Sequence, residues 1–307
     1  MRRLLALLLL ALLVLAACGD DASTSDDEEE PSGPPITDIT DLGVEGEFSE
    51  SATVEVGGGF ETESSASRVV IEGSGAPVQP DQAVRLDFAI FNATTGEAGT
   101  STYEAQAQNL ILSPLAVIPP FVDALNGVPA GSRIVLAVPP ADAGEGATQT
   151  ETAIFVLDVE ESFAGRATGT PETPPAGLPT VALGDLGKPT ITIPATEAPA
   201  ELLVQPLITG AGPPVTAGQT ATVMYTGLKW DGTQFDSSWD MLTPRDFPIG
   251  SGGVIPGWDV ALVDRPVGSQ ILMVVPPAQG YGEAGNAQAG ISGTDTLVFV
   301  VDILAAR

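Results

Sequence analysis

The last third of the chain has the clearest pattern of apolar and polar positions. Residues 220–227 alternate and are rich in β-branched side chains, which is typical of a strand. Residues 270–275 and 296–304 are apolar runs bounded by turn residues, so they predict buried strands. An Asp-Gly pair at 231–232 predicts a tight turn after the first strand.

One segment follows a helical spacing instead. Within residues 254–263, Pro256 stands near the start, and Ile255, Trp258 and Leu262 are spaced to share one face. The sequence therefore predicts an antiparallel sheet wrapped around one short helix, which is the α+β class.

The chain also contains an internal repeat. Residues 117–121 (VIPPF) match residues 254–258 (VIPGW), an offset of 137 residues. The same offset, without a gap, aligns 131–140 with 268–277 and 75–78 with 212–215. Two copies of about 120 residues are each large enough to be a domain, so the repeat predicts one fold used twice.

Composition narrows the possible chemistry. The chain has no histidine and one cysteine, which excludes a Ser-His-Asp triad, a histidine-ligated zinc site and an internal disulfide. Its 35 glycines and 27 prolines favour turn-rich β structure. A net charge of −29 repels phosphate backbones, so nucleic acid is not an expected partner. Solubility outside the cytosol is the simplest explanation of the acidity.

The first eighteen residues read as an export signal. Arg2 and Arg3 precede an apolar run at 4–15, and small residues then lead to Cys18. The Leu-Ala-Ala-Cys pattern resembles the lipobox of bacterial lipoproteins, which implies a lipid on Cys18 and attachment to the outer face of the cell membrane. A plain signal peptide with an accidental cysteine is the alternative. The rest of the chain has no apolar run long enough to span a bilayer.

Segments of biased composition separate the predicted domains. Residues 19–40 are acidic and poor in apolar side chains, so they predict a disordered tether, with a metal-binding acidic tract as the alternative. Residues 163–180 are rich in Thr, Pro and Gly and predict a semi-extended linker. The two copies are then expected at 41–162 and 181–307, as independent domains.

The second copy contains six short motifs in a fixed order, and together they resemble one family. Each motif is weak alone, but the order and spacing are similar to those of FKBP-type peptidyl-prolyl cis-trans isomerases over about residues 200–304. The motifs are VMYTG at 223–227, DGTQFDSS at 231–238, VIPGW at 254–258, VGS at 267–269, YG at 281–282 and TLVF at 296–299.

The resemblance implies a prolyl-binding pocket and a role for each residue around it. Trp258 would form the floor under the proline ring, and Tyr281 and the Ile255 N–H would donate hydrogen bonds to substrate carbonyls. Asp236 would orient Tyr225 and approach the prolyl carbonyl. The implied walls and the residue that closes one side are Tyr225, Phe235, Val254, Ile255, Phe299 and Ile291.

The implied reaction suits a protein without histidine. Rotation about a prolyl amide needs no nucleophile, proton transfer or cofactor, because its barrier comes from amide resonance. The implied partners are proline-containing unfolded or exported polypeptides, and macrolide ligands of the family. Taken singly, Trp258, Phe235 and Phe299 are ordinary core residues, and only their joint occurrence favours a pocket.

Four positions depart from the family pattern. Met241 stands where many members have an arginine, and Arg245 where an aromatic wall residue is frequent. Gly253 and Asn286 replace residues that are often Glu and His. The departures leave open a second function, a proline-peptide-binding chaperone without turnover. A structural surface protein without a pocket is the third hypothesis.

The first copy lacks most of the implied polar groups. The constant offset puts Phe88 under Tyr225 and Phe121 under Trp258, but it puts small residues under the other positions. These are Ala98 under Phe235, Gly99 under Asp236 and Gly144 under Tyr281, with Phe155 under Phe299 after a change of offset to 144. We therefore expect a degenerate copy that serves as a spacer, in dimerisation or in holding unfolded clients.

Overall fold

The computed structural model describes residues 34–307, which form two compact units. The first unit ends at Ser162 and the second begins at Phe163, with Asp81–Ala83 grouped with the second. Cys18, the predicted leader and most of the predicted tether lie outside the described residues. Within residues 34–307, no helix has the length and apolar character that a membrane crossing requires.

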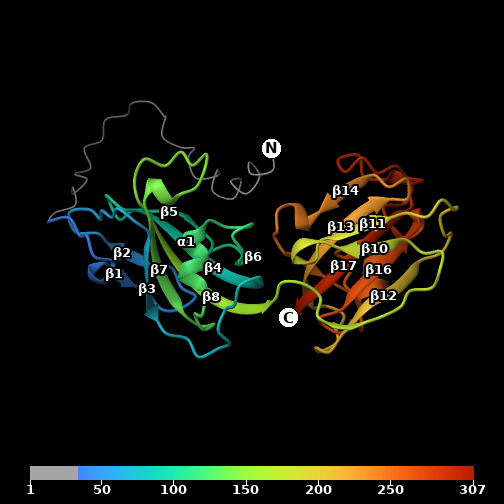
Figure 1. Ribbon diagram of the computed structural model, residues 1–307, viewed down its shortest axis with the longest axis horizontal. Helices are drawn as coiled ribbons and strands as arrows, with labels where there is room; N and C mark the ends of the chain where they lie inside the picture. The colour runs from blue at the N-terminus through green and yellow to red at the C-terminus, as the bar shows by residue number, and fades with distance from the viewer. Residues whose placement is uncertain (1–33) are drawn as a thin grey trace. The chain divides into compact units, whose positions relative to one another are not determined.

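The first unit is built on a six-stranded sheet in the order β3-β7-β8-β4-β5, with β6 also paired to β4 (Figure 1). Its α-helix, α1 (Pro119–Leu125), packs on β7 and β3. The strands of the sheet are β3 (Ala66–Ile71), β4 (Gln82–Asn92), β5 (Ala98–Ser101), β6 (Gln108–Ile111), β7 (Arg133–Val138) and β8 (Ala153–Ala164).

The second unit has a seven-stranded sheet in the order β14-β13-β17-β16-β12-β9, with β15 also paired to β13 (Figure 1). Its α-helix is α2 (Pro256–Leu262). The strands of the sheet are β9 (Gly169–Pro171), β12 (Leu203–Gly210), β13 (Thr220–Lys229), β14 (Gln234–Ser237), β15 (Arg245–Pro248), β16 (Gln270–Val275) and β17 (Leu297–Ala306). This is the expected α+β fold of antiparallel strands around a short helix.

The two units share one topology. If β9 is set aside, the strands from β12 to β17 follow the order of β3 to β8, and α1 and α2 begin 137 residues apart. A small contact repeats as well: the hydroxyl oxygens of Ser132 and Ser269 accept hydrogen bonds from the N–H groups of Gly73 and Gly210, at 2.9 and 3.0 Å. The repeat seen in the sequence is therefore a repeat of structure.

Each unit also has an N-terminal hairpin that the sequence analysis did not identify. The hairpins are β1 (Gly43–Glu45) with β2 (Thr53–Glu55), and β10 (Thr180–Leu183) with β11 (Pro189–Thr192). They too are 137 residues apart, so the repeat begins earlier than the matching motifs. The apolar side chains of β10 and β11 pack with Leu272 and Val274, on the sheet face opposite α2.

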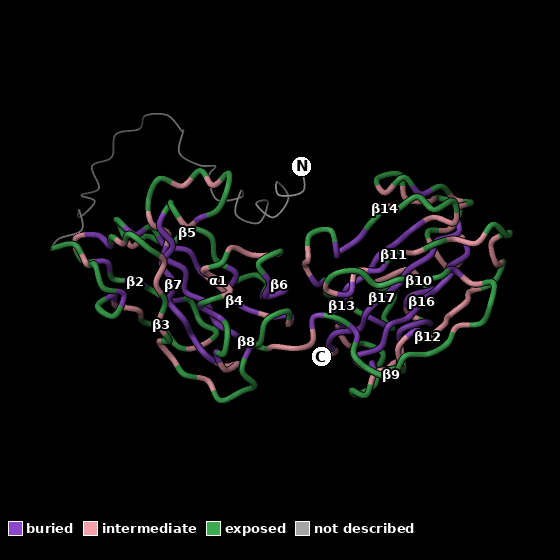
Figure 2. The backbone as a smooth tube through the Cα atoms, in the orientation of Figure 1, coloured by how far each residue is buried: buried purple, intermediate pink, exposed green. Residues whose placement is uncertain are grey.

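Alternation along the buried strands separates two apolar layers. In β16, Ile271, Met273 and Val275 pack toward α2, whereas Leu272 and Val274 pack toward the hairpin. Figure 2 accordingly shows the central strands of each unit as continuously buried. Continuous burial explains why these strands read as unbroken apolar runs in the sequence.

The predicted linker at 163–180 is part of the second unit, which is a correction. β9 pairs antiparallel with β12 and forms the edge of the sheet. Before it, the N–H of Ala167 donates to the Asp302 carboxylate at 2.8 Å, and that of Thr168 to the Gly268 carbonyl at 2.9 Å. The Thr- and Pro-rich composition thus marks an edge strand, a position where proline is tolerated.

The end of the predicted tether is also ordered. Pro35 and Ile36 form isolated bridges with Gly57 and Phe60, and Ile39 is buried in the first unit. Ile36 and Ile39 supply apolar surface that the acidic residues before them lack. The predicted tether of 19–40 therefore ends before Pro35 among the described residues.

A buried polar pair differs between the units. In the first, Arg133 lies wholly buried against Asp158, with two N–O distances of 2.7 Å. In the second, the equivalent pair is Gln270 and Asp302, joined by one hydrogen bond of 2.7 Å. Thus the first unit buries an ion pair where the second buries a carboxylate with neutral donors.

Candidate active site

The N-terminal end of α2 places an indole beneath the sheet of the second unit. Pro256 occupies the first turn, where the missing N–H has no acceptor to lose, and the Trp258 N–H donates to the Ile255 carbonyl at 2.9 Å. The Asp259 carboxylate accepts from the N–H groups of Gly250 and Gly252, at 2.6 and 2.9 Å. These contacts fix the loop before the helix and the direction of Trp258.

Trp258 is the centre of an aromatic cluster. Its ring lies edge-on to Tyr225, Phe247 and Phe299, with centroid distances of 5.5, 5.1 and 5.4 Å. Phe235 contacts Phe299 in the same way at 5.5 Å. Edge-to-face contacts hold the rings as rigid walls rather than as a flat stack.

These rings enclose a cavity of about 490 Å³. Eight of the nine residues expected at the site line it, and the exception is Ile291. The lining residues are Tyr225, Phe235, Asp236, Phe247, Gly253, Val254, Ile255, Pro256, Trp258, Gly280, Tyr281 and Phe299. The structure therefore brings together residues that are up to 74 positions apart in the chain, from 225 to 299.

Ile291 is a correction. Its side chain is 4% exposed and packs in the core between the sheet and α2, and its backbone forms a bridge with Asn286. It holds the loop before β17 together instead of lining the cavity. Nothing in this loop of mainly small and polar residues, 286–295, predicts the inward direction of Ile291.

Phe247 was missed in the sequence. It lies on β15, two residues after Arg245, and its backbone pairs with Ala221. Residues two apart on a strand share a face, and of these two Arg245 is exposed whereas Phe247 lines the cavity. The aromatic wall that the family pattern suggested near Arg245 is therefore present two positions later.

A hydroxyl–carboxylate pair is the main polar feature of the cavity. The Tyr225 hydroxyl donates to the Asp236 carboxylate. Burial, and next the bond to Asp236, raise the pKa of Tyr225 above its usual range, while the charge of Arg245 opposes this rise. The hydroxyl therefore stays protonated, and Arg245 supplies the positive charge that Met241 lacks.

Gly227 allows β13 and β14 to carry bulky rings at close quarters. A Cβ atom at Gly227 would lie 2.6 Å from the Phe235 ring and 2.9 Å from the Phe299 ring. Any larger residue would push these walls apart. A glycine is thus required at position 227, because the Phe235 and Phe299 rings lie too close to the backbone for a side chain.

Two hydrogen-bond donors remain at the cavity. Tyr281 is 37% exposed, and within residues 34–307 its hydroxyl has no intramolecular partner. The Ile255 N–H, just before α2, also donates to no described residue. Both groups can donate to carbonyl oxygens of a bound peptide.

The equivalent region of the first unit lacks the donor that Tyr281 provides, and two of the expected alignments are each wrong by one residue. Ala98 pairs with Phe91 as Gln234 pairs with Leu228, so Gly99 corresponds to Phe235 and Thr100 to Asp236. Gly144 stands at the position of Tyr281, and a Cβ there would lie 3.1 Å from Ile118. At these two positions the first unit has neither the carboxylate of Asp236 nor the phenol hydroxyl of Tyr281.

Within 34–307, no group of three or more Asp, Glu, His or Cys side chains is arranged to hold a metal ion. The cavity offers apolar walls, one carboxylate–hydroxyl pair and two free donors, which suit binding of a neutral peptide bond.

Comparison with known proteins points to one family. Residues 212–304 match the family model described as FKBP-type peptidyl-prolyl cis-trans isomerase. The chain is 38% identical over 119 residues to an FK506-binding protein of Streptomyces anulatus, covering 38% of this chain and 96% of that protein. It is 35% identical over 120 residues to a probable FK506-binding protein of Corynebacterium glutamicum, covering 39% and 98%. A crystal structure of FkpA from Escherichia coli matches with 32% identity and a TM-score of 0.33, over 43% of this chain and 53% of that one.

Proposed function

This chain belongs to the FKBP-type peptidyl-prolyl cis-trans isomerase family, and we propose that the cavity of its second unit accelerates Xaa-Pro bond rotation in exported proteins. The observation that carries the proposal is the cavity itself, in which edge-on rings surround Trp258 beside two free donors. The first unit retains the fold without this combination.

Desolvation explains how such a cavity catalyses the reaction. Resonance gives the prolyl amide a barrier of ~18–20 kcal/mol, and water bound to the carbonyl strengthens that resonance. Walls formed by Tyr225, Phe235 and Phe299 exclude this water once the proline ring rests on Trp258. Lowering the barrier by ~4 kcal/mol gives about a thousandfold acceleration.

Selective binding of the twisted amide supplies the remaining part of the rate acceleration. Tyr281 and the Ile255 N–H hold the carbonyls that flank the proline, while the bond being rotated remains among apolar groups. Asp236, fixed by Tyr225, faces the prolyl carbonyl region and disfavours a planar amide there. Contacts that form best with the twisted state increase the rate.

Removing single polar groups tests these roles. Tyr281→Phe and Asp236→Ala are each expected to reduce kcat/KM about two- to tenfold. The first removes a hydrogen bond to a substrate carbonyl, and the second removes the carboxylate that orients Tyr225 and faces the prolyl carbonyl. The measurement is cis/trans exchange of a short Xaa-Pro peptide by the full chain.

Tyr103→Phe is the matched control. It removes the same atom from the first unit, where the Tyr103 hydroxyl contacts Arg133, and it is expected to leave the rate unchanged. Equal losses in Tyr281→Phe and Tyr103→Phe would contradict the assigned roles, and an unaltered rate in both pocket variants would do so as well.

We also propose that the protein acts outside the cytoplasmic membrane, attached through lipid on Cys18. The basic, apolar and small-residue succession before Cys18 supports this, although it lies outside the described residues. Cys18→Ser is expected to abolish incorporation of labelled palmitate and to release the protein from membranes. Labelling that persists in this variant would overturn the proposal.

A further inference from the structure

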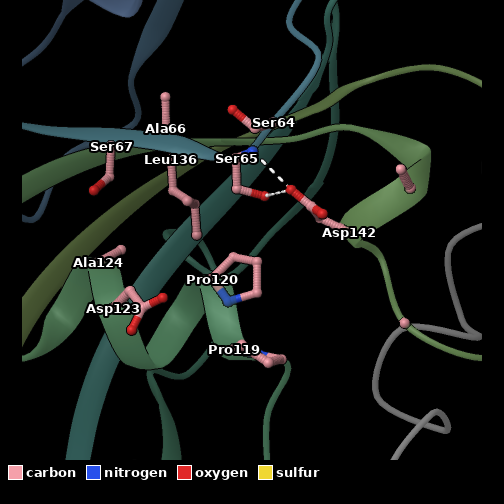
Figure 3. Close-up of a pocket in the computed structure, with 12 residues that line it drawn as sticks. Ser64, Ser65, Ala66, Ser67, Pro119, Pro120, Asp123, Ala124, Leu136 and Asp142 are labelled. Carbon is pink, nitrogen blue, oxygen red and sulfur yellow. Dashed lines mark hydrogen bonds between the residues drawn. The ribbon is translucent and has the colours of Figure 1, made fainter.

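A second cavity, of about 510 Å³, lies in the first unit at a position different from that of the prolyl pocket. It is bounded by the N-terminal end of β3 and by α1 (Figure 3). Its polar lining consists of Ser64, Ser65, Ser67, Asp123 and Asp142. We call this cavity the β3–α1 groove.

The groove exists because the two copies differ on one strand face. Ser65 and Ser67 occupy the positions of Leu202 and Val204 at the offset of 137 residues. In the second unit these two larger side chains pack against the core between the sheet and α2. The serines leave that space open and supply hydroxyl groups at its wall.

The backbone edge beside the groove is also uncovered. β3 is the outermost strand of its sheet, and no described strand lies beyond it. In the second unit, β9 covers the part of this edge that corresponds to residues 71–73, at the end of β3 away from the groove. The next residue, Glu172, donates its N–H to the carbonyl of Leu207 at a β-bulge, at 2.8 Å. Val70 stands at the same bulge of β3.

The described chain before the first hairpin does not provide the missing strand. Pro35 corresponds to Glu172 and has no N–H to donate. The Ile36 N–H instead donates to the Gly59 carbonyl, at 2.7 Å, away from β3. Among residues 34–307, therefore, no strand pairs with the outer edge of β3. The second unit shows that the C-terminal part of the equivalent edge accepts an extended Gly-Thr-Pro segment.

Charge indicates what kind of segment fits. Asp123 and Asp142 line the groove, and no basic side chain does. The N–H and hydroxyl of Ser65 both donate to one oxygen of Asp142, at 2.7 and 2.8 Å, as Figure 3 shows. These bonds lower the pKa of Asp142, so its carboxylate remains ionised at neutral pH.

From the open edge and the acidic groove together, we infer that the first unit binds an extended polypeptide segment that adds to β3 as a strand and directs a Lys or Arg side chain toward Asp123 and Asp142. Backbone pairing with β3 provides affinity for any extended sequence, and the groove selects for the basic side chain. This binding function is separate from the isomerase proposal and gives the first copy a role in holding client chains.

Binding of short fluorescent peptides to the full chain tests this inference. The probe alternates threonine and lysine, which puts the lysines on one face of a strand, and it contains no proline to occupy the prolyl pocket. One matched peptide has glutamate for lysine, and another carries N-methyl groups at the threonines, which removes donors to the edge. We expect binding of the lysine peptide only, weakened by added salt.

Two variants locate the site. Ser65→Leu with Ser67→Val gives the groove the side chains of the second unit and is expected to weaken binding tenfold or more by filling the space. Asp123→Asn alters one exposed side chain and is expected to weaken binding about two- to fivefold. Glu47→Gln, an equal charge change on the first hairpin, is the control and should leave binding unchanged.

Three results would overturn the inference. They are equal binding of the lysine and glutamate peptides, undiminished binding of the N-methylated peptide, and equal affinities of Asp123→Asn and Glu47→Gln. Sedimentation provides an independent check: a dimer that forms through this edge and is lost in Ser65→Leu/Ser67→Val would mean that a second copy, rather than a client, occupies it.

Discussion

Replacing Asp158 with asparagine is expected to destabilise the first unit by about 3–5 kcal/mol, because it leaves a buried guanidinium without its counter-charge. Arg133 has no exposed side-chain area, and both Asp158 oxygens accept from it. It also donates to the Tyr103 hydroxyl and to the carbonyls of Gly46 and Glu50, and the two carbonyl bonds hold the first hairpin. Loss of the pair therefore loosens the hairpin as well as the sheet.

The second unit provides the matched control. Asp302→Asn is expected to cause no comparable loss at pH 7, since the Gln270 amide can turn to present its oxygen to the new amide and the Ala167 N–H retains an acceptor. In the first unit, Arg133→Gln together with Asp158→Asn should be less destabilising than Asp158→Asn alone.

The two units can be followed separately. Trp230, Trp239 and Trp258 all belong to the second unit, so tryptophan fluorescence reports its unfolding alone. Amide hydrogen exchange of β7 and β8 reports the first unit. Equal stability losses for Asp158→Asn and Asp302→Asn at pH 7 would contradict the account of the two pairs.

The carboxylate that Asp302→Asn removes also makes the stability of the second unit depend on pH. Burial raises the pKa of Asp302 from 3.8 to about 6, although bonds from Ala167 and Gln270 oppose the rise. The folded state thus holds this proton more tightly than the unfolded state, and the resulting stability is complete below about pH 4 and is lost as pH rises through about 6. This group contributes a slope of at most ~1.4 kcal/mol per pH unit, which Asp302→Asn removes.

Trp258→Ala is expected to cost about 3–5 kcal/mol of stability in the second unit and to reduce isomerase activity tenfold or more in the protein that remains folded. The indole is 4% exposed and supports the Tyr225, Phe247 and Phe299 rings, so its removal leaves a cavity and frees the walls. No described group accepts a hydrogen bond from its Nε1, so the effect arises from packing.

Trp239→Ala separates the loss of stability from the loss of isomerase activity. Trp239 is 2% exposed and does not line the prolyl cavity, so its truncation should cost similar stability while the folded fraction keeps its kcat/KM. Denaturant unfolding gives the stability, and cis/trans exchange under conditions where both variants are folded gives the activity. Parallel losses of activity in both variants would show that Trp258 acts only through stability.

Sequence patterns predicted the central fold because burial and period agree there. β13, β16, β17 and α2 lie where alternation, apolar runs and helical spacing indicated. The hairpins were missed because each strand has only three or four residues and gains its stability from the sheet that it covers. β9 also has only three residues and is stabilised by pairing with the sheet, so its segment was predicted to be part of the linker at 163–180.

Site residues that belong to a sequence motif could be predicted from the sequence. Residues whose side-chain direction depends on the conformation of a loop or on strand register could not. Trp258, Tyr225 and Asp236 lie in contact across the cavity as the motif order implied. Ile291 turns into the core and Phe247 lines the cavity, because backbone bridges and strand register, rather than residue type, set their directions. The β3–α1 groove depends on a comparison of the two copies that only the structure provides.

The measurement that tests the central claim most directly is cis/trans exchange of an Xaa-Pro peptide by the full chain, titrated with a macrolide such as FK506. The account predicts acceleration above the uncatalysed rate and its complete loss at one equivalent of macrolide per chain, because only the second unit has a prolyl pocket. Absence of acceleration, activity that survives saturation, or inhibition that requires two equivalents would contradict it.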